Sequence, residues 1–264
     1  MIRGDCLAVL PTLADGSVDA VVTDPPYGQS NEAYDGPIAF GPDVWRECYR
    51  VTGPNAALLS FAGGPTYHRI ASAIEAAGWK VRQMWGWVYR DGMITSAWPR
   101  EGFDRLAPAM DPIVYATKGK VLLRLEKTGD SWDRFEGRTQ WQQRAHISTR
   151  ANGFPAVKSH GHYPRAIVSD GIDGFQYFAL SRTDGGSAKN DGHPNQKPLG
   201  LMRWLLSKLP PGGTVLDPFA GSGSTGVAAV QEGRSFLGIE QSADYCRIAR
   251  RRLKAAAAAE SPAA

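Results

Sequence analysis

A short segment near the start of the chain carries residue types that could hold an amino group. It reads Asp24-Pro25-Pro26-Tyr27. The two prolines fix the backbone and remove two N–H donors, so that the Asp24 carboxylate and the Pro25 carbonyl can accept the two hydrogens of an amino group. Tyr27 offers a flat ring on which a nucleobase can stack. The segment predicts a site for the amino group of a base. A proline turn capped by an aspartate is the alternative for this tetrapeptide alone.

A second segment, far along the chain, is rich in glycine and reads DPFAGSGSTG from Asp217 to Gly226. It lies between an expected strand and an expected helix. Glycines let the backbone approach a ligand closely, and the start of a helix presents free N–H groups. Glu240 ends the next expected strand, 19 residues after Gly221. A carboxylate there can accept hydrogen bonds from two ribose hydroxyls, so this arrangement predicts a site for an adenosine-type cofactor.

The glycine spacing alone has a rival interpretation. Gly221-x-Gly223-x-x-Gly226, followed by an acid about 20 residues later, also fits the dinucleotide fingerprint of an NAD-dependent oxidoreductase. Asp217 weakens that interpretation, because an acid just before the glycines would repel a pyrophosphate but suits a ligand that carries an ammonium group. A phosphate-binding Walker loop is excluded, since no lysine follows the glycines.

Both segments need a sheet to bring them together. Apolar runs bounded by Pro and Gly are typical of buried parallel strands. The alternation of such runs with helical patterns predicts βαβ units on a mostly parallel sheet. Strands are expected at residues 2–6, 18–23, 56–62, 81–89, 111–117, 214–216 and 235–239. Helices are expected at residues 7–13, 43–49, 66–77, 199–209, 225–232 and 243–259.

Composition narrows the class of protein. A chain of 264 residues can hold one substantial α/β domain and a smaller module. No apolar run approaches the roughly 20 residues that cross a bilayer, and no secretion signal is apparent, so we expect a cytoplasmic protein without a membrane segment. Cys6, Cys48 and Cys246 are odd in number and widely separated. That spacing argues against a disulfide framework and against a zinc knuckle.

Basic charge is concentrated in the middle of the chain. The whole chain carries a formal charge of +4, whereas residues 118–165 hold ten Lys or Arg against four acids, a net of +6. Aromatic residues are interleaved with these charges, as is typical of segments that neutralise a phosphate backbone. A solvated surface module is the alternative. The arginines that we expect to contact DNA are Arg134, Arg138, Arg144 and Arg150.

Taken together, four separated motifs resemble a known family. They are Gly4-Asp5-Cys6-Leu7, the segment Asp24–Tyr27, His193-Pro-Asn-Gln-Lys-Pro198 and the segment Asp217–Thr225. In this order they resemble the amino-methyltransferases of DNA, with the catalytic motif first and the cofactor motif last, which is the circularly permuted β class. The resemblance covers about residues 1–117 and 192–260.

The resemblance implies a Rossmann-like α/β methyltransferase fold. Its sheet would have seven mostly parallel strands, one of them antiparallel, with helices on both sides. Residues 1–117 would form the catalytic part, 118–191 an inserted target-recognition region and 192–264 the cofactor-binding part. No metal is expected, because His160 and His162 lack two further ligands at a suitable spacing.

The resemblance also implies roles for particular residues. S-adenosylmethionine would be the cofactor, with Asp5 at its adenine amino group beside Cys6, and Glu240 at its ribose. The methionine end would lie against one turn, formed by Asp217, Pro218, Phe219, Gly221, Gly223, Ser224 and Thr225. The methionine carboxylate would be flanked by Gln196, Lys197 and Pro198. Asn195 departs from the family, which more often has Thr there. The catalytic residues would be Asp24, Pro25, Pro26 and Tyr27.

The expected activity is methyl transfer to the N6 of a flipped adenine in double-stranded DNA. The alternative within the same chemistry is transfer to the N4 of cytosine, although those enzymes more often have Ser in place of Asp24. A noncatalytic DNA-binding protein is an alternative of another class. The resemblance leaves open whether a cognate restriction endonuclease is a partner and whether the enzyme acts as a monomer or a homodimer.

Overall fold

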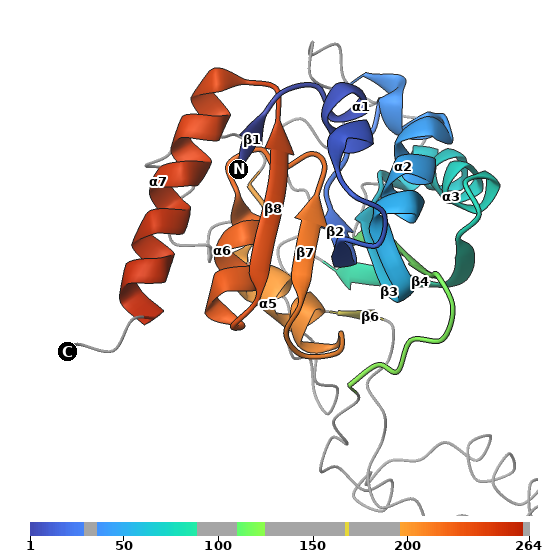
Figure 1. Ribbon diagram of the computed structural model, residues 1–264. Coiled ribbons are helices and arrows are strands. Elements are labelled where there is room, and N and C mark those ends of the chain that lie inside the picture. The colour runs from blue at the N-terminus through green and yellow to red at the C-terminus, as the bar shows by residue number, and fades with distance from the viewer. Residues whose placement is uncertain (29–35, 89–109, 125–166, 169–195, 261–264) are drawn as a thin grey trace, which may run out of the picture.

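A single sheet organises the protein. The computed structural model describes residues 1–28, 36–88, 110–124, 167–168 and 196–260 (Figure 1). The described strands form one sheet in the order β1-β8-β7-β2-β3-β5-β4-β6. Their bounds are β1 Ile2–Arg3, β2 Val18–Thr23, β3 Thr52–Phe61, β4 Lys80–Val88, β5 Met110–Thr117, β6 Ile167–Val168, β7 Thr214–Asp217 and β8 Ser235–Glu240.

Strand directions confirm the predicted sheet. β1, β8, β7, β2 and β3 are parallel neighbours. β5 runs antiparallel to both of its neighbours, β3 and β4, and is the predicted antiparallel strand. These seven strands were all expected from the sequence. The two-residue strand β6 was not, and it adds an eighth strand in parallel to β4 at the edge.

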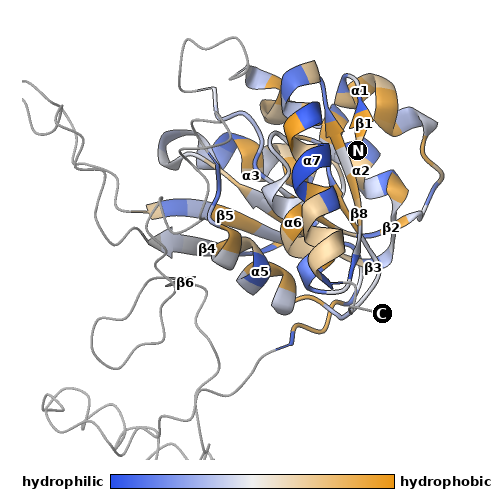
Figure 2. Cartoon of the chain, turned by 90° about the vertical axis from the view of Figure 1, so that its left-hand side faces the viewer, coloured by the Kyte–Doolittle hydropathy of each residue, from blue (hydrophilic) through white to orange (hydrophobic). Residues whose placement is uncertain are grey.

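Helices cover both faces of the sheet. α1 (Cys6–Val9), α2 (Asp43–Val51) and α3 (Tyr67–Ala76) lie on one side, and α5 (Leu199–Ser207) and α6 (Ser224–Gln231) on the other (Figure 1). α7 (Ala243–Glu260) packs beside α6, and hydrophilic and hydrophobic residues alternate along its length (Figure 2). None of the helices in the described part of the chain is both long and apolar enough to span a membrane.

Residues on the two faces of the sheet belong to two separate hydrophobic cores. In β2, Val18 and Val21 join the cluster beneath α1, α2 and α3, whereas Ala20 and Val22 join the cluster beneath α5 and α6. Side chains of a strand point to opposite faces in turn, so a strand covered on both faces must be apolar throughout. Each fully buried aliphatic side chain of this kind contributes about 1.5–3 kcal/mol. This double burial explains the apolar run of residues 20–22, whereas the one acid of β2, Asp19, is exposed.

One expected helix is shorter than predicted. The segment 7–13 forms α1 and then a 3-10 helix, η1 (Leu10–Thr12), instead of one continuous α-helix. Pro11 lies at the start of η1, has no N–H to donate, and its ring would clash with the carbonyl four residues earlier in an α-helix. Pro11 therefore accounts for the change of helix type.

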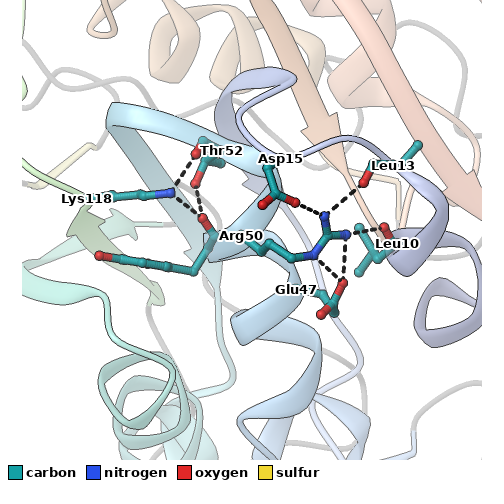
Figure 3. A network of polar contacts seen from close by, with 8 residues as sticks. Leu10, Leu13, Asp15, Glu47, Arg50, Thr52 and Lys118 are labelled. Carbon is teal, nitrogen blue, oxygen red and sulfur yellow. Dashed lines mark hydrogen bonds and ion pairs between the residues drawn. The ribbon is translucent and has the colours of Figure 1, made fainter.

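A polar network holds the segment before β2 against the end of α2 (Figure 3). The Arg50 guanidinium donates to the carbonyls of Leu10 and Leu13 at 2.8 and 2.9 Å, and it also contacts Asp15 and Glu47. These contacts join η1 and the loop that enters β2 to the helix on the same face.

Lys118 belongs to this body and not to a solvated basic surface. Its ammonium donates to the carbonyls of Tyr49 and Thr52, both at 2.7 Å, and lies 4.5 Å from the centre of the Tyr49 ring (Figure 3). In the sequence, Lys118 was counted with the basic segment. In the structure its ammonium instead binds two backbone carbonyls of the fold.

The topology predicts where a ligand should bind. From β7 the chain passes through α6 to β8 on one side, and from β2 it passes through α2 to β3 on the other. β7 and β2 are parallel neighbours, with Ala20 opposite Val215. In doubly wound sheets, ligands bind at the carboxyl ends of the two strands where the connections diverge in this way. Here those ends lead directly into Asp24 and Asp217.

Candidate active site

The early turn, Asp24–Gly28, follows β2 at this edge of the sheet. The Tyr27 hydroxyl donates to Asp24 Oδ1 at 2.5 Å, and the Lys197 ammonium donates to Asp24 Oδ2 at 2.7 Å. Lys197 lies 3.2 Å from the Tyr27 hydroxyl oxygen. The Asp24 side chain remains 26% exposed, so its carboxylate is still accessible to a further donor. The turn therefore presents an acceptor whose two oxygens are already oriented by donors.

The late turn, Asp217–Gly223, follows β7 and is held by a buried carboxylate. Asp217 is 2% exposed. Its Oδ1 accepts from the Thr23 hydroxyl at 2.6 Å and from the Phe219 N–H at 3.1 Å, and its Oδ2 accepts from the Thr225 hydroxyl at 2.6 Å. Burial raises the pKa of Asp217 to about 6, although these hydrogen bonds act in the opposite direction. Asp217 thus faces the protein interior and shapes the turn from behind.

Thr23 joins the two turns. It is the last residue of β2, directly before Asp24, and its hydroxyl is bound to Asp217 across the strand boundary. The two turns therefore lie side by side on one edge of the sheet. A single pocket formed by both turns requires this arrangement.

The glycines of the late turn are required by geometry. Gly221 and Gly223 have φ of +50° and +83°, which L-residues with a side chain adopt at a cost. A Cβ on Gly223 would lie 2.9 Å from Ala249 Cβ in α7. A Cβ on Gly226 would lie 2.4 Å from the Phe236 ring. At Gly223 and Gly226 the late turn and the start of α6 are therefore packed against β8 and α7 with no room for a side chain.

Glu240 and Asp5 lie beside this turn at the end of β8. Glu240 Oε2 accepts from the Gly221 N–H at 2.9 Å, and Oε1 accepts from the Ser242 N–H at 2.7 Å. The Gly4 N–H donates to the Glu240 carbonyl at 3.0 Å, so Asp5 follows at the same edge. Asp5 caps α1 by accepting from the Leu7 N–H at 2.8 Å, and its side chain is exposed. Each carboxylate oxygen has two acceptor positions, so both acids can still take a further donor.

Arg252 is a site residue that the sequence did not reveal. Together with its neighbours in α7, it fits the pattern of a solvated basic face. In the structure its guanidinium donates to the Ser222 carbonyl at 2.8 Å and to the Ser222 hydroxyl at 3.1 Å, and it contacts the Gln196 amide. Arg252 therefore fastens the late turn to the segment that precedes α5. Only the spatial proximity of α7 to the turn could have indicated this.

The remaining predicted residues are placed as follows. Cys6 is buried in the core beneath α1, and burial raises the pKa of its thiol to about 12. Pro25, Pro198 and Pro218 are buried, whereas Pro26 and Phe219 are partly exposed. Ser224 and Thr225 begin α6. Within the described residues, no group of three or more His, Cys, Asp or Glu side chains could hold a metal ion. Residues outside the described ranges are Arg134, Arg138, Arg144, Arg150, His160, His162 and Asn195.

Comparison with known proteins agrees with this geometry. DNA adenine methyltransferase YhdJ of Escherichia coli (strain K12) is 27% identical over 280 residues, covering 97% of this chain and 83% of the relative. The solved complex of M1.HpyAVI with SAM has a TM-score of 0.62 at 23% identity, covering 95% of this chain and 97% of that one. The cytosine-N4-specific PvuII DNA methyltransferase has a TM-score of 0.63 at 17% identity, covering 96% and 85%. The DNA methylase family of N6 and N4 methyltransferases matches residues 18–251, and the chain therefore belongs to it.

Proposed function

We propose that this DNA methylase transfers the methyl group of S-adenosylmethionine to the N6 of an adenine in double-stranded DNA. The observation that carries the proposal is the Thr23–Asp217 hydrogen bond of 2.6 Å, which sets the acceptor turn and the glycine turn against each other. A methyl donor and an amino group can meet only if their two binding turns are adjacent. The rest of the site supports this proposal in detail.

The residues of the late turn fit S-adenosylmethionine, which is the cofactor of this enzyme family. When bound, it supplies a methyl group on a positively charged sulfur. The glycine backbone and the start of α6 suit its methionine end, Glu240 suits its ribose hydroxyls, and Asp5 suits its adenine amino group. Because the Asp217 carboxylate is buried and accepts three hydrogen bonds, we propose that it serves the cofactor through the shape of the turn.

The early turn suits the amino group of an extruded base. Asp24 and the Pro25 carbonyl would accept its two hydrogens while the Tyr27 ring stacks on the base. These acceptors favour a nitrogen lone pair outside the ring conjugation. In the proposed step, that lone pair would form the new N–C bond while the methyl–sulfur bond breaks with its electrons left on sulfur, and the nitrogen would then release one proton. The Asp24 carboxylate would be the acceptor in contact with that nitrogen.

Two observations favour adenine as the base. Asp24 occupies the position at which cytosine-N4 enzymes more often have Ser, and YhdJ, a relative along nearly the whole chain, is an adenine methyltransferase. PvuII methyltransferase demonstrates that the same fold also serves cytosine N4. Mapping the modified base in DNA from cells that express this chain distinguishes the two, and N4-methylcytosine alone would contradict our choice.

Replacement of Asp24 by Ala tests the proposed chemistry. We expect at least a 100-fold loss of labelled methyl transfer to DNA, on the order expected when a preorganised active-site group is lost. Binding of S-adenosylmethionine, measured by calorimetry, should remain close to that of the wild type, because Asp24 belongs to the early turn. Arg247→Met, on the exposed face of α7, is the matched control. Substantial turnover by the Asp24→Ala variant would contradict the amino-group role.

The segment 118–191 is proposed to bind DNA through Arg134, Arg138, Arg144 and Arg150. Reversing the charge of all four should weaken DNA binding and flatten the dependence of log affinity on log salt by about one unit for each phosphate that is no longer neutralised. Binding measured between low and moderate salt checks this. An unchanged salt slope would show that other residues neutralise the phosphates.

A further inference from the structure

The ammonium of Lys197 lies within the early turn, although the resemblance expects it beside the methionine carboxylate. Its Nζ is 2.7 Å from Asp24 Oδ2 and 3.9 Å from Asp111 Oδ2. The Lys197 side chain is only 11% exposed, and that of Asp111 is 17% exposed. A buried ammonium is tolerated where carboxylates compensate its charge, and here two carboxylates surround it.

Four separate elements build the surroundings of Lys197. Asp24 follows β2, Asp111 lies in β5, and Phe61 ends β3 with its ring centre 5.0 Å from Nζ. Lys197 itself precedes Pro198, the buried residue that caps the start of α5. A proline restricts both its own backbone and that of the residue before it, so the backbone at Lys197 has little conformational freedom.

The ion pair between Lys197 and Asp24 has a direct consequence for the Asp24 carboxylate. Asp24 takes one protein donor on each oxygen, Tyr27 on Oδ1 and Lys197 on Oδ2. The Tyr27 contact alone would fix only Oδ1. The charge-assisted donor at 2.7 Å fixes Oδ2 as well. Each oxygen still has one acceptor position for an incoming N–H.

We propose that Lys197 is a positioning residue for methyl transfer, which holds Asp24 as an oriented anion so that it can accept the amino group of the base. This inference rests on the proposed function and deepens it. It assigns Lys197 to the early turn and to the chemical step. Gln196, the preceding residue, contacts Arg252 at the late turn, so two consecutive residues serve different turns.

Lys197→Met removes the charge and the donor while keeping a long side chain. We expect kcat to fall about 100-fold, since a small displacement of a catalytic group has effects of this size. The Kd of S-adenosylmethionine, measured by calorimetry, should change less than about threefold. The KM for DNA should change much less than kcat, because the lysine orients the acceptor used in the chemical step. Lys197→Arg, which keeps a charged donor, should recover part of the lost kcat.

Lys208→Met is the matched control. Lys208 is a second buried lysine at the other end of α5, with its ammonium over the Trp204 ring. This variant should match the wild type in kcat and in the KM for DNA. Circular dichroism and thermal unfolding establish that each variant is folded. If Lys197→Met does not fold, Lys197→Gln decides, because its shorter, uncharged side chain should also lower kcat with little change in the KM for DNA.

Two results would overturn the inference. One is an unchanged kcat in the folded, uncharged variant. The other is a raised Kd of S-adenosylmethionine with normal kcat at saturation, which would return Lys197 to the cofactor. Wild-type methyl transfer is measured in the same assay. Its absence would refute the proposed function itself, and the two failures are therefore distinguishable.

Discussion

The two turns at the centre of the sheet are held in different ways. The late turn depends on a carboxylate that is 2% exposed, on hydroxyl and backbone donors, and on glycines packed against β8 and α7. The early turn depends on an ion pair and a tyrosine hydroxyl around a carboxylate that is 26% exposed. Buried, close-packed contacts resist displacement, whereas a partly exposed carboxylate can keep its protein donors and still accept a further one.

This difference matches what each turn must do. A cofactor site gains affinity when its backbone is already in the bound shape, because less ordering is needed on binding. An acceptor for an incoming amino group must instead be oriented yet remain open to a new donor. The comparison predicts that changes at the late turn alter stability and cofactor affinity, whereas changes at the early turn alter turnover.

The largest expected effect on stability is that of Gly226→Ala. The new Cβ would lie 2.4 Å from the Phe236 ring and 2.8 Å from Leu253 Cδ2, so β8 or α7 must shift. We expect a loss of about 3 kcal/mol in the free energy of unfolding, as for other overpacked cores. Chemical denaturation measures it. Gly41→Ala, where a Cβ meets nothing within 4 Å, is the control and should change stability little. Equal stability of the two variants would contradict the close-packed late turn.

A smaller, pH-dependent effect is expected for Asp217→Asn. Burial raises the pKa of Asp217 to about 6 from 3.8, so its charged form is disfavoured in the folded state. The contribution of this group to stability is complete below about pH 3.8 and is lost as the pH rises towards 6. The free energy of unfolding of the wild type relative to Asp217→Asn should therefore fall by about 2 kcal/mol between about pH 4.5 and pH 7. A difference that stays constant or rises with pH would argue against the buried acid.

The smallest effect should come from Arg252→Met. The arginine fastens the late turn to α7, and loss of its charged hydrogen bonds should raise the KM for S-adenosylmethionine about tenfold. Because the early turn is untouched, kcat should stay close to that of the wild type. Steady-state kinetics with saturating DNA measures both values. A lower kcat with an unchanged KM would remove the distinction between the two turns.

Local sequence patterns predicted most of the fold. The apolar runs of β2, β3, β7 and β8 were identified because strands buried on both faces leave continuous patterns. β6 was not predicted, since it lies within residues 118–191, where the sequence shows no periodic pattern. The helix type of residues 7–13 could be predicted correctly only if Pro11 was given more weight than the helical pattern around it.

The site was predictable in its motifs but not in its charge contacts. Asp24, Glu240 and the glycines lie at strand ends, where spacing alone indicates a site. The partners of Lys197 and Arg252 come from elements distant in sequence, and only the packed fold brings them together. A long basic side chain can reach any of several neighbours, so its type and position do not specify its contact.

The pairing of β2 with β7 also determines when this protein can fold. Thr23 and Asp217 are 194 residues apart, yet they belong to neighbouring central strands. During synthesis β2 emerges long before β7. The apolar residues of β2 therefore lack this neighbouring strand until most of the chain has been made. Completion of the central sheet is therefore a late, long-range event in folding.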